Sequence, residues 1–216
     1  YYQAYFAAKA GLSCKNYLEQ AASCSPDCCF PNRLEDIKVL RFAMEQNPAD
    51  FKAPYYLGNL FYDKERHEDA IRCFETSIAL GCSFATPYRN LSLLTYNVRH
   101  DAAKALELLS AAFSMDKEDA RVLYELDMLK KKTCVSAKER LAFLEEYLDI
   151  AEKRDDLYLE YITLLNLNGD CEKALKLLLA RRFHPWEGGE GKVPEQYLSS
   201  LIAIAAKELH AGNLTD

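Results

Sequence analysis

The stretch YYLGNLFYDKERHEDAIRCFETSIAL, residues 55–80, decides the fold. In its first half the bulky Leu57 stands beside the small Gly58, which leaves room for a neighbouring ring. In its second half the small Ala70 allows two helices to approach closely, and Phe74, four residues later, fills the remaining space. The stretch therefore predicts two antiparallel helices that pack against each other.

This pattern repeats along the chain. The stretch YRNLSLLTYNVRHDAAKALELLSAAFSM, residues 88–115, aligns with it, and equivalent positions follow at steps of 34 or 35 residues. In the first helices these positions are Leu57, Leu91, Leu126 and Tyr161, and in the second helices they are Ala70, Ala105, Arg140 and Ala174. One helix pair cannot bury its own apolar face, so the pairs must stack on one another.

A repeat of this length, with Leu-Gly early in the first helix and Ala before an aromatic residue in the second, resembles the tetratricopeptide repeat (TPR). The resemblance covers residues 50–182 as four repeats. The third repeat departs from the pattern at Arg140, where Ala is usual, and the fourth has Tyr161 and Ile162 in place of Leu-Gly. The resemblance implies an all-α, right-handed superhelical solenoid of antiparallel helix pairs, with about twelve helices and no sheet.

Four segments are expected along one continuous solenoid. Residues 1–49 hold divergent helical repeats, residues 50–182 hold the four TPR-like repeats, residues 183–193 form a loop rich in Trp and Gly, and residues 194–210 form a C-terminal helix. Pro194 suits the first turn of that helix. The chain starts without Met in the middle of a helical pattern, so we expect it to be a piece of a longer protein.

Several stretches are also similar to the C-terminal repeat region of large bacterial proteins. They are APYYLGNLFYDK (53–64), VLYEL (122–126), RDDLYLEYITLLNLNGD (154–170) and above all RRFHPWEGGEGKVPEQY (181–197). In those proteins a β-rich domain of unassigned function, suggestive of carbohydrate-active folds, precedes the repeats. The resemblance implies that such a domain lies upstream of this chain, but it does not imply an activity.

Composition and charge narrow the classes of function. The 33 acidic and 27 basic residues give a formal charge of −6, whereas nucleic-acid binding requires concentrated positive charge. The apolar run LSSLIAIAA, residues 198–206, is far shorter than the roughly 20 residues that span a bilayer. We therefore expect neither a nucleic-acid partner nor a membrane span.

Cysteines and glycines do not indicate a metal or cofactor site. The eight cysteines are scattered through helical patterns, as is typical of thiols in a reducing compartment, so we predict a cytoplasmic protein. The cluster CSPDCC, residues 24–29, lacks a second paired group and a nearby His, so we expect no metal. In GGEGK, residues 188–192, Val193 follows the Lys where a phosphate-binding loop needs Ser or Thr, so we expect no cofactor.

The stretch RRFHPWEGGEGKVPEQY, residues 181–197, contains the only Trp of the chain. Pro185 stops the preceding helix, and the glycines allow a tight turn. We predict that Phe183 and Trp186 anchor this loop by packing between the fourth repeat and the last helix, and that Trp186→Ala costs about 3 kcal/mol of stability. The alternative is that the loop contacts a ligand or an absent domain.

In TPR solenoids the first helices line a concave groove. By register, the groove candidates for partner binding are Tyr55, Asn59, Tyr62, Arg89, Asn90, Tyr96 and Arg121, and the same faces carry Lys52, Leu93, Glu125, Glu160, Thr163 and Asn166. Tyr and Asn offer broad contact with adaptable hydrogen bonds, and Arg holds carboxylates.

Some members of the TPR family clamp a peptide's terminal carboxylate with Asn, Lys and Arg. Asn59, Asn90 and Arg121 match that clamp, whereas Tyr55 and Glu125 depart from it, and Glu125 would repel a carboxylate. The alternative is that the groove candidates only pack between neighbouring first helices.

The sequence therefore predicts a non-catalytic protein-interaction scaffold that binds a peptide or partner domain, or another domain of the same chain, in its groove. A second hypothesis makes it the accessory helical segment of a carbohydrate-active enzyme whose catalytic domain lies upstream. The apolar residues of the last helix outnumber what one packed face can use, so we also expect weak homodimer formation through that helix.

Overall fold

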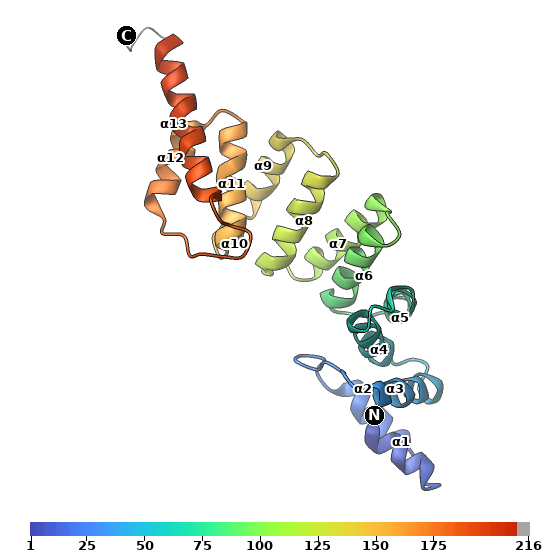
Figure 1. Cartoon of the computed structure of the whole chain (residues 1–216). Coiled ribbons are helices and arrows are strands. Elements are labelled where there is room, and N and C mark those ends of the chain that lie inside the picture. Colours follow the sequence, from blue (N-terminus) through green and yellow to red (C-terminus); the bar gives the residue numbers. More distant parts are fainter. Residues whose placement is uncertain (211–216) are drawn as a thin grey trace. The chain divides into compact units, whose positions relative to one another are not determined.

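The computed structural model describes residues 1–210, and within them all regular structure is helical (Figure 1). The chain divides into two compact units, unit 1 (Tyr1–Asp116) and unit 2 (Lys117–Asp216). The helices of unit 1 are α1 (Tyr2–Lys9), α2 (Lys15–Ser23), α3 (Leu34–Gln46), α4 (Lys52–Asp63), α5 (His67–Ala79), α6 (Ala85–Asn97) and α7 (Ala102–Met115). Those of unit 2 are α8 (Ala120–Lys132), α9 (Ala137–Glu146), α10 (Leu148–Ala151), α11 (Asp155–Leu167), α12 (Cys171–Ala180) and α13 (Lys192–His210).

The predicted all-α arrangement of helix pairs is confirmed for residues 1–210. The pairs α4/α5, α6/α7, α8/α9 and α11/α12 correspond to the four repeats of the sequence. The described residues contain thirteen helices rather than about twelve, because the short α10 interrupts the connection between α9 and α11.

The turn inside each helix pair contains one residue with a positive φ. Glu65, His100, Cys134 and Gly169 have φ values of 57°, 55°, 61° and 86°. In three of these turns the following amide donates to the carbonyl five residues earlier, for example Arg66 N to Phe61 O at 2.8 Å. This hydrogen bond ends the first helix with its carbonyls satisfied and reverses the chain.

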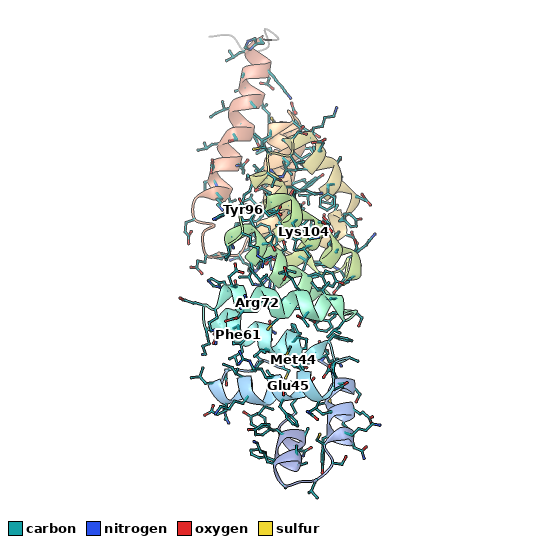
Figure 2. All side chains as sticks on the ribbon, turned by 90° about the vertical axis from the view of Figure 1, so that its right-hand side faces the viewer. Met44, Glu45, Phe61, Arg72, Tyr96 and Lys104 are labelled. Carbon is teal, nitrogen blue, oxygen red and sulfur yellow. The ribbon has the colours of Figure 1, made fainter. Side chains whose placement is uncertain are left out.

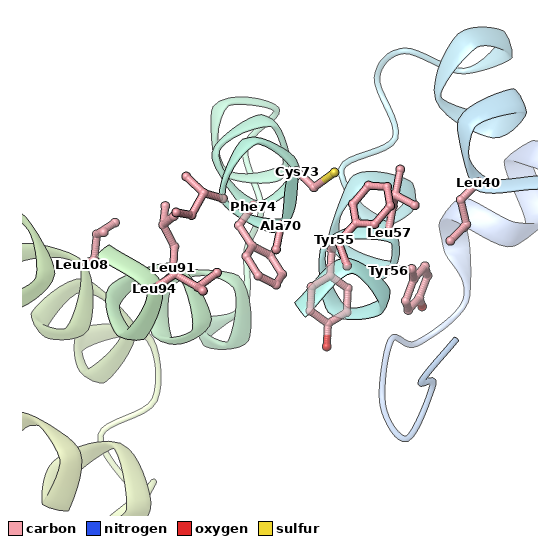
Figure 3. Packing of buried hydrophobic residues seen from close by; sticks show 12 residues of the cluster. Leu40, Tyr55, Tyr56, Leu57, Ala70, Cys73, Phe74, Leu91, Leu94 and Leu108 are labelled. Atoms are coloured by element: carbon pink, nitrogen blue, oxygen red, sulfur yellow. The ribbon is translucent and has the colours of Figure 1, made fainter. Parts of the chain in front are cut away.

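The core of unit 1 forms around the α4/α5 pair (Figure 3). Tyr55, Leu57 and Phe74 are buried in it, and Leu91 and Leu94 extend it into α6. Gly58 lies directly against the Phe74 ring, since a Cβ at Gly58 would stand 2.7 Å from Cε1 of that ring. The predicted use of a small residue to admit a ring is confirmed.

In the α6/α7 pair, a hydrogen bond is found at the helix contact where Gly58 lies in the α4/α5 pair. Figure 2 shows its side chains beside those of the first pair, with Phe61 in α4, Tyr96 in α6 and Lys104 in α7. The residue equivalent to Gly58 is Ser92, which is buried and whose Oγ donates to Ala105 O at 2.7 Å. Ala105 is itself fully buried, so its small side chain again permits close approach of the two helices.

Candidate functional site

A pocket opens in unit 2 on the face formed by its first helices, which we call the first-helix face. It has a volume of about 210 Å³ and collects side chains from α8, α11, the start of α13 and the loop before α13. The lining residues are Tyr124, Met128, Lys131, Asp156, Leu159, Glu160, Thr163, Trp186, Lys192, Glu195 and Gln196.

The pocket combines two aromatic rings with a charged wall. Tyr124 and Trp186 are half-buried, so each has surface available to a ligand. Met128 and Leu159 add apolar surface, while Glu160 supplies a carboxylate from α11. Aromatic and aliphatic surface with a few fixed polar groups is the usual make-up of a binding site.

Glu160 is held in place by two cations. Lys131 Nζ and Arg140 Nη2 each lie 2.7 Å from its Oε1. Within residues 1–210 its other oxygen, Oε2, accepts no hydrogen bond from the protein. Burial alone would raise the pKa of Glu160, but the hydrogen bonds from Lys131 and Arg140 hold the pKa below its ordinary value, so the carboxylate stays charged.

Arg140 is fixed in turn by a buried ion pair between α8 and α9. Its guanidinium binds Asp127 with two hydrogen bonds, Nε to Oδ1 at 3.0 Å and Nη2 to Oδ2 at 2.6 Å. Asp127 is 0% exposed and Arg140 is 3% exposed. Burial raises the pKa of Asp127, and the Arg140 donors oppose that rise. The unusual Arg140 of the third repeat therefore neutralises the buried Asp127 and also holds Glu160 in the pocket wall.

The outer wall of the pocket carries a second ion pair. Arg154 Nε and Nη2 donate to the two Asp156 oxygens at 3.0 and 2.6 Å, and the Arg154 Cζ lies 5.7 Å from the centre of the Tyr124 ring. Burial raises the pKa of Tyr124, and the carboxylates of Asp156 and Glu160 raise it further against the opposing charge of Arg154. The field at the Tyr124 hydroxyl is thus negative on balance.

The loop before α13 is built around Trp186. A Cβ at Gly189 would stand 2.3 Å from the indole Cε2, so the ring lies flat against a position that only Gly can occupy. Gly188 and Gly191 have φ values of 73° and 77°, which also favour Gly. Gly189 N donates to Trp186 O at 3.0 Å. Gly189 therefore makes room for the indole, and Gly188 and Gly191 allow the turns of the loop that place Trp186 at the pocket.

The groove candidates of unit 1 divide into buried and exposed groups. Tyr55 is only 3% exposed and packs edge-on against Phe84, so its ring belongs to the core rather than to a groove surface. Lys52 is also buried, and its ammonium binds Ala22 O at 2.6 Å and the Cys24 carbonyl at the end of α2. These two side chains hold helices together.

The remaining candidates of unit 1 lie at or near its surface. Asn90 Nδ2 donates to Asn59 Oδ1 at 3.0 Å, and Arg89 Nη1 donates to Asn90 Oδ1 at 3.2 Å, so these three side chains join α4 to α6. Tyr62 is 41% exposed and Tyr96 is half-buried.

The candidates of unit 2 lie in three places. Arg121 Nε pairs with Glu125 Oε1 at 3.2 Å on the exposed part of α8. Glu160 and Thr163 line the pocket, as their register on the first-helix face predicts. Asn166 lies outside the pocket lining, where its Nδ2 donates to Gln196 O at 3.1 Å and its Oδ1 accepts from Ser200 Oγ at 2.8 Å.

The loop anchors differ from the predicted apolar plug. Phe183 is half-buried against Tyr158 and Arg181, and Trp186 is half-buried at the pocket. Because the indole is only partly buried, we expect Trp186→Ala to cost less than the about 3 kcal/mol of a fully buried aromatic. Hydrogen bonds of Asn166 and of Lys207 also join α13 to the fourth repeat, and Ser200 is the buried residue of α13.

Sequence reasoning missed Asp127, Tyr124 and Lys131 as members of this site. A signal for Asp127 was present, because Asp127 takes the place of Gly58 in the same repeat whose Ala is replaced by Arg140. Two charged substitutions of opposite sign at facing positions indicate an ion pair. Tyr124 and Lys131 carried no signal of their own, since Tyr and Lys are common on exposed helix faces.

No family model matches the chain. Among solved structures, it is similar to YrrB, a TPR protein with an unusual peptide-binding site, at 18% identity over 95% of this chain and 88% of that one, with a TM-score of 0.55. A TPR-domain protein from Parabacteroides distasonis matches at 20% identity over 87% of this chain and 34% of that one, with a TM-score of 0.62. MamA matches at 14% identity over 79% and 88%, with a TM-score of 0.53. The chain therefore has the TPR fold.

Two features are absent from residues 1–210. Among their helices, none combines the length and apolar character that crossing a bilayer requires. Their His, Cys, Asp and Glu side chains form no group of three placed to hold a metal ion.

Proposed function

We propose that this protein is a non-catalytic interaction scaffold that binds a peptide segment of a partner on its first-helix face. The pocket of unit 2 carries this proposal, because it brings two aromatic rings and a fixed carboxylate together on that face. The peptide-binding site of YrrB, a protein of the same fold, is consistent with such a use.

Unit 1 carries candidates for partner contact on its own first helices. Tyr62, Arg89, Asn90 and Tyr96 lie on the first helices α4 and α6, and Arg121 adds a cation at the start of α8. Tyr55 is left out because its ring is buried. The partner is a peptide, a protein domain or another part of the same full-length chain, all of which present extended backbone and side chains to such a face.

Selection from a random library of displayed 12-residue peptides on the full chain tests the proposal. The selected peptides are then measured against Trp186→Ala and Tyr124→Ala, with Tyr62→Ala and Tyr96→Ala as the matched aromatic substitutions in unit 1. We expect the two pocket variants to lose about ten-fold or more in affinity, as truncated aromatic anchors do. Failure to select any peptide, or equal affinity for all four variants and the unaltered chain, would contradict the proposal.

The hypothesis of an accessory segment for a carbohydrate-active enzyme concerns sequence upstream of Tyr1. The full-length sequence tests it, because it requires a β-rich domain with catalytic carboxylates before the helical repeats. Without such a domain the hypothesis fails, while the peptide-binding proposal is unaffected.

A further inference from the structure

The pocket of unit 2 presents an unused acceptor to a ligand. Both protein donors to Glu160 bind its Oε1, and within residues 1–210 its Oε2 receives none, although the side chain lines the pocket. Lys131 and Arg140 keep this carboxylate in one position. A fixed, charged oxygen favours a donor from the ligand, and most of all a charged one.

The aromatic rings of the pocket favour the same charge. Trp186 and Tyr124 both line it, and the faces of these rings attract cations by about 0.5–2 kcal/mol. Tyr124 already has the guanidinium of Arg154 near its ring. Gly189 holds the Trp186 indole on one side, so the ring is positioned before any ligand arrives.

The pocket lining carries three carboxylates, Asp156, Glu160 and Glu195, and two lysines, Lys131 and Lys192. Burial is the largest cause of the raised pKa of Tyr124, and the carboxylates of Asp156 and Glu160 raise it further against the opposing charge of Arg154. Of the two lysines that line the pocket, Lys131 binds Glu160 at 2.7 Å, and Lys192 lies on the first turn of α13 together with Glu195. Among the residues that line the pocket, carboxylates outnumber lysines by three to two.

We propose that this pocket binds a basic side chain, arginine or lysine, of the bound peptide, with Glu160 Oε2 accepting from its cationic head and Trp186 and Tyr124 covering its stem. The inference rests on the proposed peptide-binding function and specifies the residue that the peptide must bring. It makes Glu160 the residue that decides specificity.

The fluorescence of Trp186 measures this directly, because it is the only Trp of the chain. The full chain is titrated with three capped nonapeptides, acetyl-GSGAXAGSG-amide, in which X is arginine, its neutral isostere citrulline, or glutamate. We expect the arginine peptide to bind about ten-fold more tightly than the citrulline peptide, since hydrogen bonds to charged groups contribute about 1.5–3 kcal/mol. The glutamate peptide should bind more weakly than both.

Matched variants assign the effect to the pocket. Glu160→Gln keeps the shape and the Oε1 acceptor but removes the charge, so the preference for arginine over citrulline should fall to about two-fold or less. Glu187→Gln, an exposed carboxylate next to Trp186 that does not line the pocket, should leave the preference unchanged. Thermal unfolding checks that both variants are folded.

Any of four results would overturn the inference. They are a response to none of the three peptides, equal binding of the arginine and citrulline peptides, tighter binding of the glutamate peptide, and an unchanged preference in Glu160→Gln. The library selection described above is independent of peptide charge, so peptides that are selected there but ignore Glu160→Gln leave the proposed function standing while this inference fails.

Discussion

In the α4/α5 pair of unit 1, Gly58 of the first helix receives the ring of Phe74, and Ala70 lets the helices approach. In the α8/α9 pair of unit 2, the positions equivalent to Gly58 and Ala70 hold Asp127 and Arg140, which form a buried bidentate ion pair. The two pairs have the same fold but opposite chemistry at their contact. The repeat therefore requires complementary residues at this contact rather than particular ones.

The difference also separates what each pair can do. Phe74 of unit 1 belongs to the apolar core at this position, whereas Arg140 of unit 2 also binds Glu160, which lines the pocket. A buried ion pair is costly to form, and its retention next to a candidate binding site is consistent with a role in positioning.

The largest expected effect is at Arg140. Arg140→Ala restores the usual residue of the repeat but leaves the buried Asp127 without its partner, so we expect a loss of about 3–5 kcal/mol in the free energy of unfolding. Chemical denaturation of the full chain measures it. The double variant Asp127→Ala/Arg140→Ala removes both charges and should be more stable than Arg140→Ala alone. Additive losses would show that the two residues do not depend on each other.

The next effect is at the contact in unit 1. Gly58→Ala places a methyl group against the buried Phe74 ring, and overpacking of this kind costs about 1–3 kcal/mol. Adding Phe74→Leu makes room, so the double variant should lose less than the sum of the two single losses. Simple additivity in thermal and chemical unfolding would contradict the close contact.

A smaller effect is expected at the hydrogen-bonded contact. Ser92→Ala in α6 removes the Oγ donor to Ala105 O and leaves that carbonyl with its helical partner, so we expect a loss of about 1 kcal/mol. Ser114→Ala is the matched control, because its Oγ bonds an exposed carbonyl of its own helix. A loss in Ser114→Ala equal to that in Ser92→Ala would contradict a specific role for the buried hydrogen bond.

Substitutions in the turns between paired helices should change the stability by a similar amount. Gly169→Ala should cost about 1 kcal/mol, whereas His100→Gly and Cys134→Gly should be neutral or stabilising, because a left-handed conformation costs a side chain about 1–2 kcal/mol. Unfolding midpoints of the three variants measure this. Stabilisation by Gly169→Ala would show that the turns differ in conformation.

The fold was predictable because the repeat period alone sets which residues face each other. Leu57, Leu91, Leu126 and Tyr161 follow at steps of 34 or 35 residues, and all four are buried in their first helices. Register also placed Glu160 and Thr163 on the first-helix face, where they line the pocket.

Other parts of the site depend on contacts that a period does not contain. Tyr55 shares the helix of Asn59 and Tyr62, but Phe84 from the next repeat covers its ring. Trp186 lies in a non-repeating loop whose path is set by Gly189 and by two left-handed glycines. The place of Trp186 in the pocket wall follows from that path, so the sequence predicted an anchor, with ligand contact as the alternative, but it did not predict the pocket.

The smallest expected effect is on the exposed stripe of α13. Leu198, Leu201, Ile202 and Leu209 lie on this helix with their side chains in solvent, and Ile202 is 68% exposed. Leu198→Glu and Ile202→Glu should therefore change the free energy of unfolding by no more than about 0.5 kcal/mol, as surface substitutions do. Ser200→Ala on the same helix should cost more, about 1 kcal/mol, because Ser200 is buried and its Oγ donates to Asn166. Light scattering at increasing protein concentration tests the predicted weak homodimer in the same samples. If the stripe joins two copies, the mass of the unaltered chain rises with concentration and Ile202→Glu abolishes that rise. A constant monomer mass in the unaltered chain contradicts pairing through α13. If Ile202→Glu lost as much stability as Ser200→Ala, Ile202 would have to be covered within the chain. The predicted difference between the exposed apolar residues and the buried Ser200 of α13 would then be wrong.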